Sequence, residues 1–394
     1  MRGCGAGTRG TAVVGIHFLV LTVLVSSTVR ADSPVKFGDP VVGLTAAELV
    51  RFVDGRDEFE EEETPEQGLG PVFNATSCAK CHASPAVGGD SNILETRFGG
   101  LIGKKFDPML NAGGSLIQTD GSDPAHGCVG ETVPPDATIV AKRKSTPLFG
   151  LGLVDHVPDA TLQQLAKDQP RAVAGRPSMV RDATSGQLRV GRFGWKAQQA
   201  TLVTFAADAY LNEMGITSPV FPNDNAPGGD TAMLDECDKV PGLEDDGSGV
   251  AAFADFMTML APPPRGATSR GAENGAAIFT RIGCATCHVP QLTTGPSAIA
   301  ALNNVTFAPF SDFLLHDMGA LGDGIEQNTA SGREMKTAPL WGLRARTRYL
   351  HDARASTLEG AIREHDGQGS AARAAFDALG KGDAADLIAF LRTL

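Results

Sequence analysis

Apolar side chains recur at the spacing of an α-helix in two segments, residues 250–260 and 383–394. A helix turns once every 3.6 residues, so apolar residues three and four positions apart share one face. Asp383 can cap the second helix. A third helix-like stretch spans about 198–214, and alternating strand patterns are few. The pattern therefore predicts a mainly α protein. The apolar positions are Phe253, Phe256, Met257 and Leu260 in the first segment, and Leu387, Ile388, Leu391 and Leu394 in the second.

Several landmarks occur twice in the same order, which indicates an internal repeat. The hexapeptide TPLFGL at 146–151 matches APLWGL at 338–343, and a Thr-Leu pair follows each copy. The two apolar helices end the two copies. Three consecutive prolines, 262–264, cannot continue a helix and indicate a linker. The repeat predicts two domains, 32–260 and 261–394, the first with an insertion of about 166–249.

The N-terminus has the pattern of a secretion signal. Arg2 and Arg9 precede a mostly apolar run at 11–25, and small residues at positions 29 and 31 predict cleavage after Ala31. The run is short for a membrane span of about 20 residues, although an uncleaved anchor is the alternative. We therefore expect a signal peptide at 1–31 and a periplasmic or otherwise exported mature chain with no stable membrane span.

The charge balance bears on partners. The chain has a net charge of −12, and removing the three arginines of the signal makes the mature chain three units more negative. A nucleic acid favours a basic surface, so this class of partner is disfavoured. A basic redox protein would be compatible, although simple solubility is the favoured explanation of the acidity.

Two C-x-x-C-H motifs carry the clearest chemistry. They are Cys78, Cys81 and His82, and Cys284, Cys287 and His288. This spacing allows two thiols to join the vinyl groups of one haem while the histidine binds the iron. A structural zinc would need four ligands together, and no third C-x-x-C or paired histidine supplies them. The motifs predict two covalently bound haem c groups.

Two further cysteines remain in the mature chain, Cys128 and Cys237. In an oxidising compartment they could form a disulfide. Two reduced structural thiols are the alternative.

The quoted motifs occur within a longer pattern that resembles the bacterial di-haem oxidoreductases, also called putative peroxidases and thiol oxidoreductase-like proteins. The segments that carry the resemblance are GLGPVFN at 68–74, TPLFGLGLVDHVPD at 146–159, GRFGWKA at 191–197, SDFLLHDMG at 311–319 and TAPLWGLRARTRYLHDARASTLEGAIREH at 337–365. A more distant similarity runs to bacterial di-haem cytochrome c peroxidases. The resemblance implies two cytochrome-c-like helical domains, the first with a long insertion.

The resemblance also implies a distal ligand for the second haem, in the segment that leads from Thr357 to His365. His365 would make this haem bis-histidine with His288, and an imidazole in place of a thioether lowers the reduction potential. Met318 is the rival ligand. Ala353 replaces the glycine of the family's H-D-G, so the local turn is in doubt.

The sixth ligand of the first haem stays open. The repeat places Gln169 near the position of His365, and glutamine is a poor haem ligand. The iron is therefore either open to peroxide or bound by a residue such as His126 or His156. We interpret His316 and His351 as structural residues.

The remaining chemical candidates are weaker. Trp195 and Trp341 are core residues or electron relays, and Lys196 is a surface charge or a propionate partner. Acidic loops such as the one at 245–246 could bind calcium, although their spacing matches no definite site.

Three functions remain open at this stage. One is a peroxidase-type oxidoreductase that draws electrons from a small redox protein or cytochrome. The second is an electron-transfer cytochrome with both irons six-coordinate. A thiol-disulfide oxidoreductase is the third and is disfavoured, because haem would consume both cysteine pairs.

Overall fold

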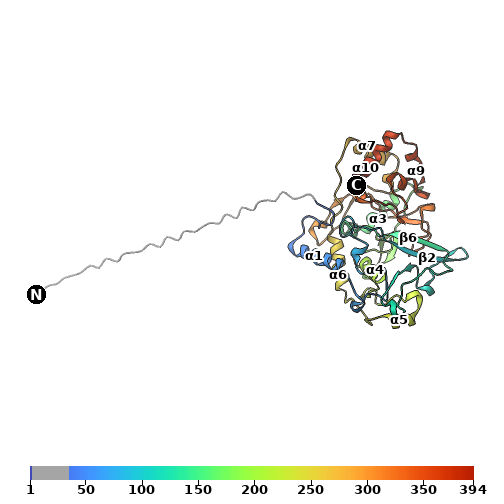
Figure 1. Ribbon diagram of the computed structural model, residues 1–394. Helices are drawn as coiled ribbons and strands as arrows, with labels where there is room; N and C mark the ends of the chain where they lie inside the picture. Colours follow the sequence, from blue (N-terminus) through green and yellow to red (C-terminus); the bar gives the residue numbers. More distant parts are fainter. Residues whose placement is uncertain (2–34) are drawn as a thin grey trace. The chain divides into compact units, whose positions relative to one another are not determined.

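The computed structural model describes Met1 and residues 35–394 (Figure 1). The predicted signal peptide, 1–31, lies outside the described residues apart from Met1. Residues 35–394 form one compact unit. Among the described residues no helix is both long and apolar enough to cross a bilayer.

One group of helices packs around α6 (Ser248–Met259), the helix predicted at 250–260. It lies along α1 (Ala46–Glu60), whose first turn is closed by a capping box between Thr45 and Glu48. A Cβ on Gly55 would lie 2.2 Å from the carbonyl oxygen of Ala252, so this close approach requires glycine. The group also includes α2 (Leu151–Asp155) and α4 (Leu202–Met214), which both pack on α6. Two further helices, α3 (Asp159–Asp168) and α5 (Thr231–Cys237), lie between α2 and α6 in the sequence.

A second group is built on α7 (Arg270–Arg281) and α10 (Lys381–Leu391), which lie side by side (Figure 1). A Cβ on Gly275 would lie 2.0 Å from the carbonyl oxygen of Asp386, so the two helices touch backbone to backbone there. Asp383 lies inside the first turn of α10 and Gly380 precedes the helix, so the predicted cap at Asp383 is wrong. Two short helices complete the group, α8 (Leu358–Arg363) and α9 (Ser370–Asp377).

Strands form several small antiparallel sheets. The largest is centred on β2 (Leu94–Ile102), which pairs with β3 (Lys105–Asp107), β4 (Leu116–Ile117) and β6 (Ile139–Lys144). The register places Thr96 opposite Lys142 and Ile117. The two-stranded pairs are β1 (Val72–Phe73) with β5 (Asp120–Gly121), β7 (Ser178–Arg181) with β8 (Leu188–Gly191), β9 (Leu292–Thr293) with β10 (Thr306–Phe307), and β11 (Leu315–Asp317) with β12 (Glu334–Lys336).

The fold is therefore mixed, with 36% helix and 15% strand, and the prediction of mainly α, cytochrome-c-like helical domains is wrong. The physical reason lies in the largest sheet. Its strands bury charged side chains, including Arg143 and Lys144 of β6, and Gly99 and Gly100 interrupt β2. Buried charges and glycines erase the apolar–polar alternation by which a strand is recognised.

The larger hydrophobic core includes residues from both predicted halves. Phe256 and Phe149 share it with Phe307 and Trp341. A smaller core lies between α7, α8, α9 and α10. The division of the chain at residues 260 and 261 stays a prediction.

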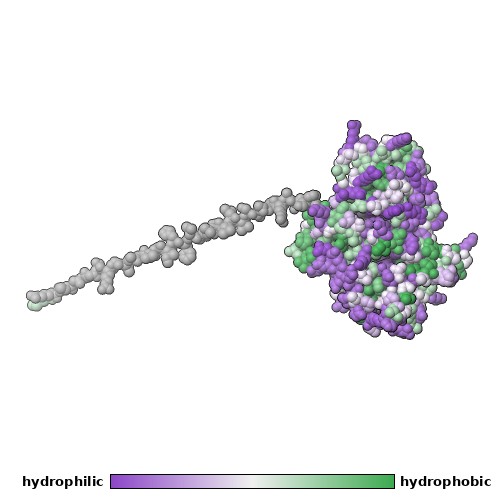
Figure 2. All heavy atoms as spheres, in the orientation of Figure 1, coloured by the Kyte–Doolittle hydropathy of each residue, from purple (hydrophilic) through white to green (hydrophobic). Residues whose placement is uncertain are grey.

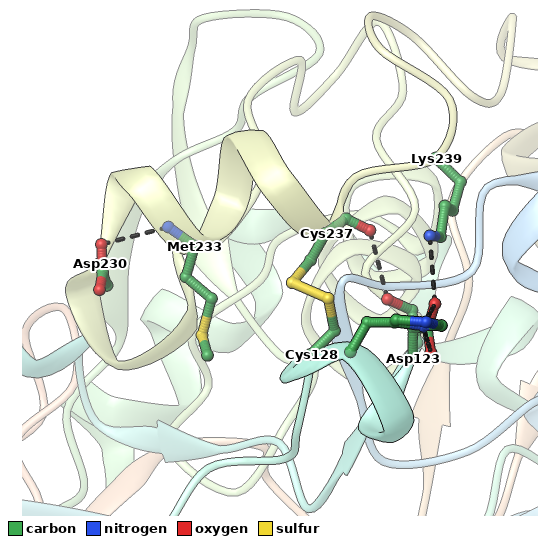
Figure 3. The surroundings of a disulfide bond; sticks show 8 residues. Asp123, Cys128, Asp230, Met233, Cys237 and Lys239 are labelled. Carbon is green, nitrogen blue, oxygen red and sulfur yellow. Dashed lines mark hydrogen bonds and ion pairs between the residues drawn. A yellow bond between two sulfur atoms is a disulfide. The ribbon is translucent and has the colours of Figure 1, made fainter.

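A disulfide joins Cys128 to Cys237 at the end of α5, which answers the question left open by the sequence (Figure 3). Two contacts lie beside the disulfide. Ser122 donates a hydrogen bond to the carbonyl oxygen of Cys237, and Lys239 forms an ion pair with Asp123. The disulfide thus ties α5 to the loop before β6.

Figure 2 shows hydrophilic side chains over much of the visible face, with apolar patches between them. The end of β2 contributes exposed apolar residues, with Ile102 72% exposed and Leu101 54% exposed.

Candidate haem sites

The second C-x-x-C-H motif follows α7 directly. Gly283 has φ +91°, a conformation that glycine adopts readily, and it reverses the chain into the short turn Cys284–Thr286. Both cysteines are free thiols in the structure. Burial raises the pKa of Cys284 to about 11. One tight turn therefore holds the two cysteines of the motif close together.

A cavity of about 360 Å³ opens beside this motif. Both cysteines, His288 and the predicted distal ligand His365 line it together. Most of its wall is apolar, as haem sites require. The apolar lining includes Phe279, Leu340, Leu343, Leu358, Ile362, Leu387 and Leu391.

His288 and His365 face one another across this cavity. Their ring centres lie 6.4 Å apart. His288 Nδ1 donates to the carbonyl oxygen of Phe310 at 3.0 Å, and His365 Nδ1 donates to that of Ala361 at 2.9 Å. A carbonyl can only accept, so each ring keeps its proton on Nδ1 and leaves the Nε2 lone pair free. Burial, and then the neighbouring His365, lower the pKa of His288 to about 4. Both rings are therefore poised as neutral ligands.

The residues present fit a haem. A metal–imidazole bond is about 2.0 Å long and each ring centre lies about 1 Å further back, so one metal between two imidazoles separates the ring centres by about 6 Å. The observed 6.4 Å agrees with that value. Two thiols beside one of the histidines, at the wall of the same apolar cavity, complete the donor set that a haem c requires.

The rival ligand Met318 also lines the cavity. The structure therefore brings both candidates to the same place. The ring pairing with His288 favours His365.

His316, Asp312 and Gln169 form a hydrogen-bonded cluster that contacts the second motif. His316 Nε2 lies 2.9 Å from an Asp312 carboxylate oxygen, and His316 Nδ1 lies 3.7 Å from Cys287 Sγ. Burial would lower the pKa of His316, but the hydrogen bond with Asp312 raises it to about 10. Gln169 donates to the same carboxylate at 2.6 Å and to the carbonyl oxygen of Thr286 at 2.8 Å. Gln169 is thus engaged at the second motif, in a role that the repeat did not predict.

The first motif has a matching arrangement. His82 Nδ1 donates to the carbonyl oxygen of Gly89 at 3.0 Å, which again leaves Nε2 free, and burial lowers the pKa of His82. The ring of Phe59 packs at 6.1 Å from that of His82. Cys78 and Cys81 are free thiols, and burial raises their pKa values to about 12 and about 11.

Two acidic residues near the first motif, Glu95 and Glu213, were not predicted from the sequence. Burial, and then Glu95, raise the pKa of Glu213 to about 8, so Glu213 is largely protonated at neutral pH. Burial is the main cause of the raised pKa of Cys81, and the negative charges of Glu213 and Glu95 raise it further. Glu95 also pairs with Arg97 at 3.0 Å. The structure thus places a half-buried proton donor within electrostatic range of this motif.

The other candidate ligands for the first haem have different surroundings. His126 is on the surface, with its side chain 80% exposed, and pairs with Asp123. His156 Nδ1 donates to the carbonyl oxygen of Gly152 at 2.7 Å. The sixth ligand of the first haem stays open.

The tryptophans and Lys196 are held by specific contacts. Trp195 lines the cavity and donates to the carbonyl oxygen of Lys144 at 2.7 Å, and its ring packs edge-to-face against that of His351. Trp341 is buried in the larger core. Lys196 is fully buried and pairs with Asp323 at 2.9 Å, so its interpretation as a surface charge is wrong.

The acidic loop at 245–246 is engaged in capping. The Asp245 carboxylate accepts from the backbone nitrogens of Gly249 and Val250 at the start of α6. A different acidic cluster, Asp224, Asp238 and Glu244, has carboxylate oxygens within 4.8 Å of one another. Oxygen-rich clusters of this kind suit calcium, and calcium binding stays a prediction.

Comparison with known proteins gives one family match. The model described as "Di-haem oxidoreductase, putative peroxidase" matches residues 126–394, a span that contains the second motif but not the first. A search of curated protein sequences found no significant relative.

Solved structures match only remotely. The diheme peroxidase BthA from Burkholderia thailandensis is 14% identical, with a TM-score of 0.41, over 88% of this chain and 86% of that one. Hydrazine synthase from Kuenenia stuttgartiensis is 15% identical, with a TM-score of 0.40, over 96% and 100%. A MauG-like protein associated with microbial copper homeostasis is 16% identical, with a TM-score of 0.32, over 67% and 92%.

Proposed function

Because this chain belongs to the di-haem oxidoreductase family, we propose that it is an exported c-type cytochrome that passes electrons between two covalently bound haems. Cys78, Cys81 and His82 would hold the first haem, and residues 284–288 the second. The single observation that carries the proposal is the pairing of His288 and His365 across the apolar cavity, 6.4 Å between ring centres.

The second haem would serve electron transfer. His288 and His365 would both be ligands of this haem and would leave no position for a substrate, and the bound group would supply reversible one-electron transfer. The protein's own part is to fix both rings. The carbonyl oxygens of Phe310 and Ala361 hold the Nδ1 protons, so each imidazole is locked in one tautomer and one orientation.

Peroxide reduction at the first haem is the second candidate function. One specific observation favours it, namely the half-buried Glu213, whose raised pKa of about 8 keeps a proton available at neutral pH. Cleavage of the O–O bond needs a proton donor, and a pKa close to the working pH suits general acid catalysis. Asn74 Nδ2 donates to Glu213 at 2.9 Å and orients its carboxyl group.

The electron donor would be a small redox protein or cytochrome, and the acidic net charge favours a partner with a basic docking face. Export would follow from the predicted signal peptide. It would place haem attachment and the disulfide in the same oxidising compartment.

Two measurements test these proposals. A pyridine haemochrome spectrum with intact mass should show two covalent haems on a chain that begins at Asp32. Electron paramagnetic resonance should show a low-spin bis-histidine signal for one of them. A colourless exported protein with four alkylatable thiols in the two motifs would overturn the assignment.

The peroxidase function needs its own test. Stopped-flow mixing of half-reduced protein with hydrogen peroxide should give fast oxidation with turnover. Glu213→Gln should slow this step while leaving both haems in place. Slow bleaching in the wild type would leave electron transfer as the function.

A further inference from the structure

Two cationic side chains line the cavity of the second motif without a carboxylate partner among the described residues. Lys336, at the end of β12, is 7% exposed, and the nearest acceptor of its Nζ is the carbonyl oxygen of Thr337, at a long 3.5 Å. Arg346 follows the short turn Leu343–Ala345. Its Nη2 donates to the carbonyl oxygen of Trp341 at 3.3 Å, and its Nε is buried without a partner.

Other buried cations in the described part of the chain are paired. Lys144 lies 2.7 Å from Asp90, and Arg143 and Lys196 share Asp323. Burying a charge without a counter-charge costs several kcal/mol, so buried cations are normally matched by anions. Lys336 departs from the pattern of these buried cations, and so does the buried Nε of the half-buried Arg346.

The two cations also oppose one another. Burial lowers the pKa of Lys336 to about 8; the negative charge of Asp312 opposes this effect, and the positive charge of Arg346 adds to it. Anionic groups inside the cavity would stabilise two like charges at its apolar wall. The cavity therefore calls for a ligand with negative charge as well as a large apolar surface.

We propose that Lys336 and Arg346 bind the two propionate carboxylates of the second haem, an inference that rests on the proposed haem at Cys284 and Cys287. A haem c is apolar except for these two carboxylates, which lie at the edge away from the thioether bonds. An ammonium and a guanidinium would match two carboxylates in number and sign, and the free Nε of Arg346 supplies a donor for one of them. The cations would also stabilise the reduced haem, because a nearby positive charge disfavours the ferric state.

The test uses the full mature chain with Lys336→Met and Arg346→Leu made separately. Pyridine haemochrome and mass should still give two haems per chain. Resonance Raman difference spectra should show a shift of the propionate bending band of one haem. At fixed ambient potential, the ferrous-to-ferric ratio of the bis-histidine haem should fall about tenfold, equal to about 59 mV for one electron.

Matched variants separate a propionate contact from a general loss of charge. Arg344→Leu removes a charge from the same turn, but Arg344 is exposed and donates to the carbonyl oxygen of Pro264. This variant should therefore change neither the propionate Raman band nor the reduction potential of the bis-histidine haem. Lys336→Arg should restore the wild-type Raman band, and Lys336→Gln provides a smaller change if Lys336→Met fails to fold.

The outcomes are distinguishable. Variants that keep both haems with an unchanged propionate band and an unchanged potential would overturn the inference alone. A wild-type chain without covalent haem would overturn the proposed function instead.

Discussion

Asp323 lies at the centre of a buried ionic triad that joins distant parts of the chain. Its carboxylate is 2.7 Å from Arg143 of β6 and 2.9 Å from Lys196, and the three side chains are 0–2% exposed. Burial would raise the pKa of Asp323, but Arg143 and Lys196 hold it below its usual value. The carboxylate is therefore ionised at neutral pH, and Asp323→Ala would leave two cations in the interior without their counter-charge.

Removing one partner of a buried ion pair costs about 3–5 kcal/mol, because the remaining charge stays buried. Since Asp323 neutralises two cations, we expect Asp323→Ala to lower the free energy of unfolding by about 4–5 kcal/mol at pH 7. The pKa of Asp323 is lower in the folded chain than its ordinary 3.8, so the triad's stabilisation is complete above that value. It is lost as the pH falls through the folded pKa.

Guanidinium denaturation of the full chain measures the loss, and Asp317→Ala is the matched control. Asp317 pairs with Arg333 at 3.0 Å, but the two side chains are 48% and 64% exposed. Such a surface pair contributes about 0–1 kcal/mol. Equal losses for Asp323→Ala and Asp317→Ala would refute the reasoning, because they would mean that burial adds nothing to the pair.

Three further predictions concern the second haem, the disulfide and a buried carboxylate. His365→Met should replace the bis-histidine signal with a far-red methionine–iron band and raise the potential; an unchanged near-infrared spectrum would exclude His365 as the ligand. Cys128→Ser opens a link across 109 residues, and loop entropy predicts a loss of about 4–5 kcal/mol in denaturation, with no further loss when reductant is added. Asp182 accepts hydrogen bonds from Ser185 and Thr204 at 2.6 Å, which lower its pKa against the opposing effect of burial. Asp182→Asn should lower stability by about 1.5–3 kcal/mol at neutral pH, and the difference from wild type should shrink in titrations below pH 3.8, the usual pKa of the group.

The helices that close the two repeats were predictable because each buries one continuous apolar face. The helix predicted at 250–260 is α6, and the stretch at 198–214 contains α4. The sheet around β2 was not predictable, because its strands are short and its buried positions include Arg143 and Lys144. A charge is buried there only because a partner from another segment neutralises it, and no local window contains that partner.

Candidate site residues could also be named from the sequence where a cofactor's chemistry requires a fixed spacing of residues. The spacing of the C-x-x-C-H motifs predicts covalent haem attachment, and the family pattern predicts His365 as a ligand; both stay predictions. The structure brings that residue to the cavity of the second motif. Glu213 and Lys336 were missed, because their interest comes from burial without a neutralising partner. That property depends on tertiary packing and leaves no pattern in the sequence.

Segments outside the repeated landmarks also contact the second site. Gln169, at the start of the predicted insertion, holds Asp312 and the carbonyl oxygen of Thr286, and the backbone nitrogen of Lys336 donates to the carbonyl oxygen of Trp195 at 2.9 Å. The duplicated motifs thus supply similar anchors, while non-repeated residues shape each environment. A difference in function between the two haems should therefore reside in such residues: in our proposal His365 would bind one iron, and Glu213 would hold a proton near the other. Exchanging the C-x-x-C-H pentapeptides between the two positions should consequently leave the spectra of both haems nearly unchanged.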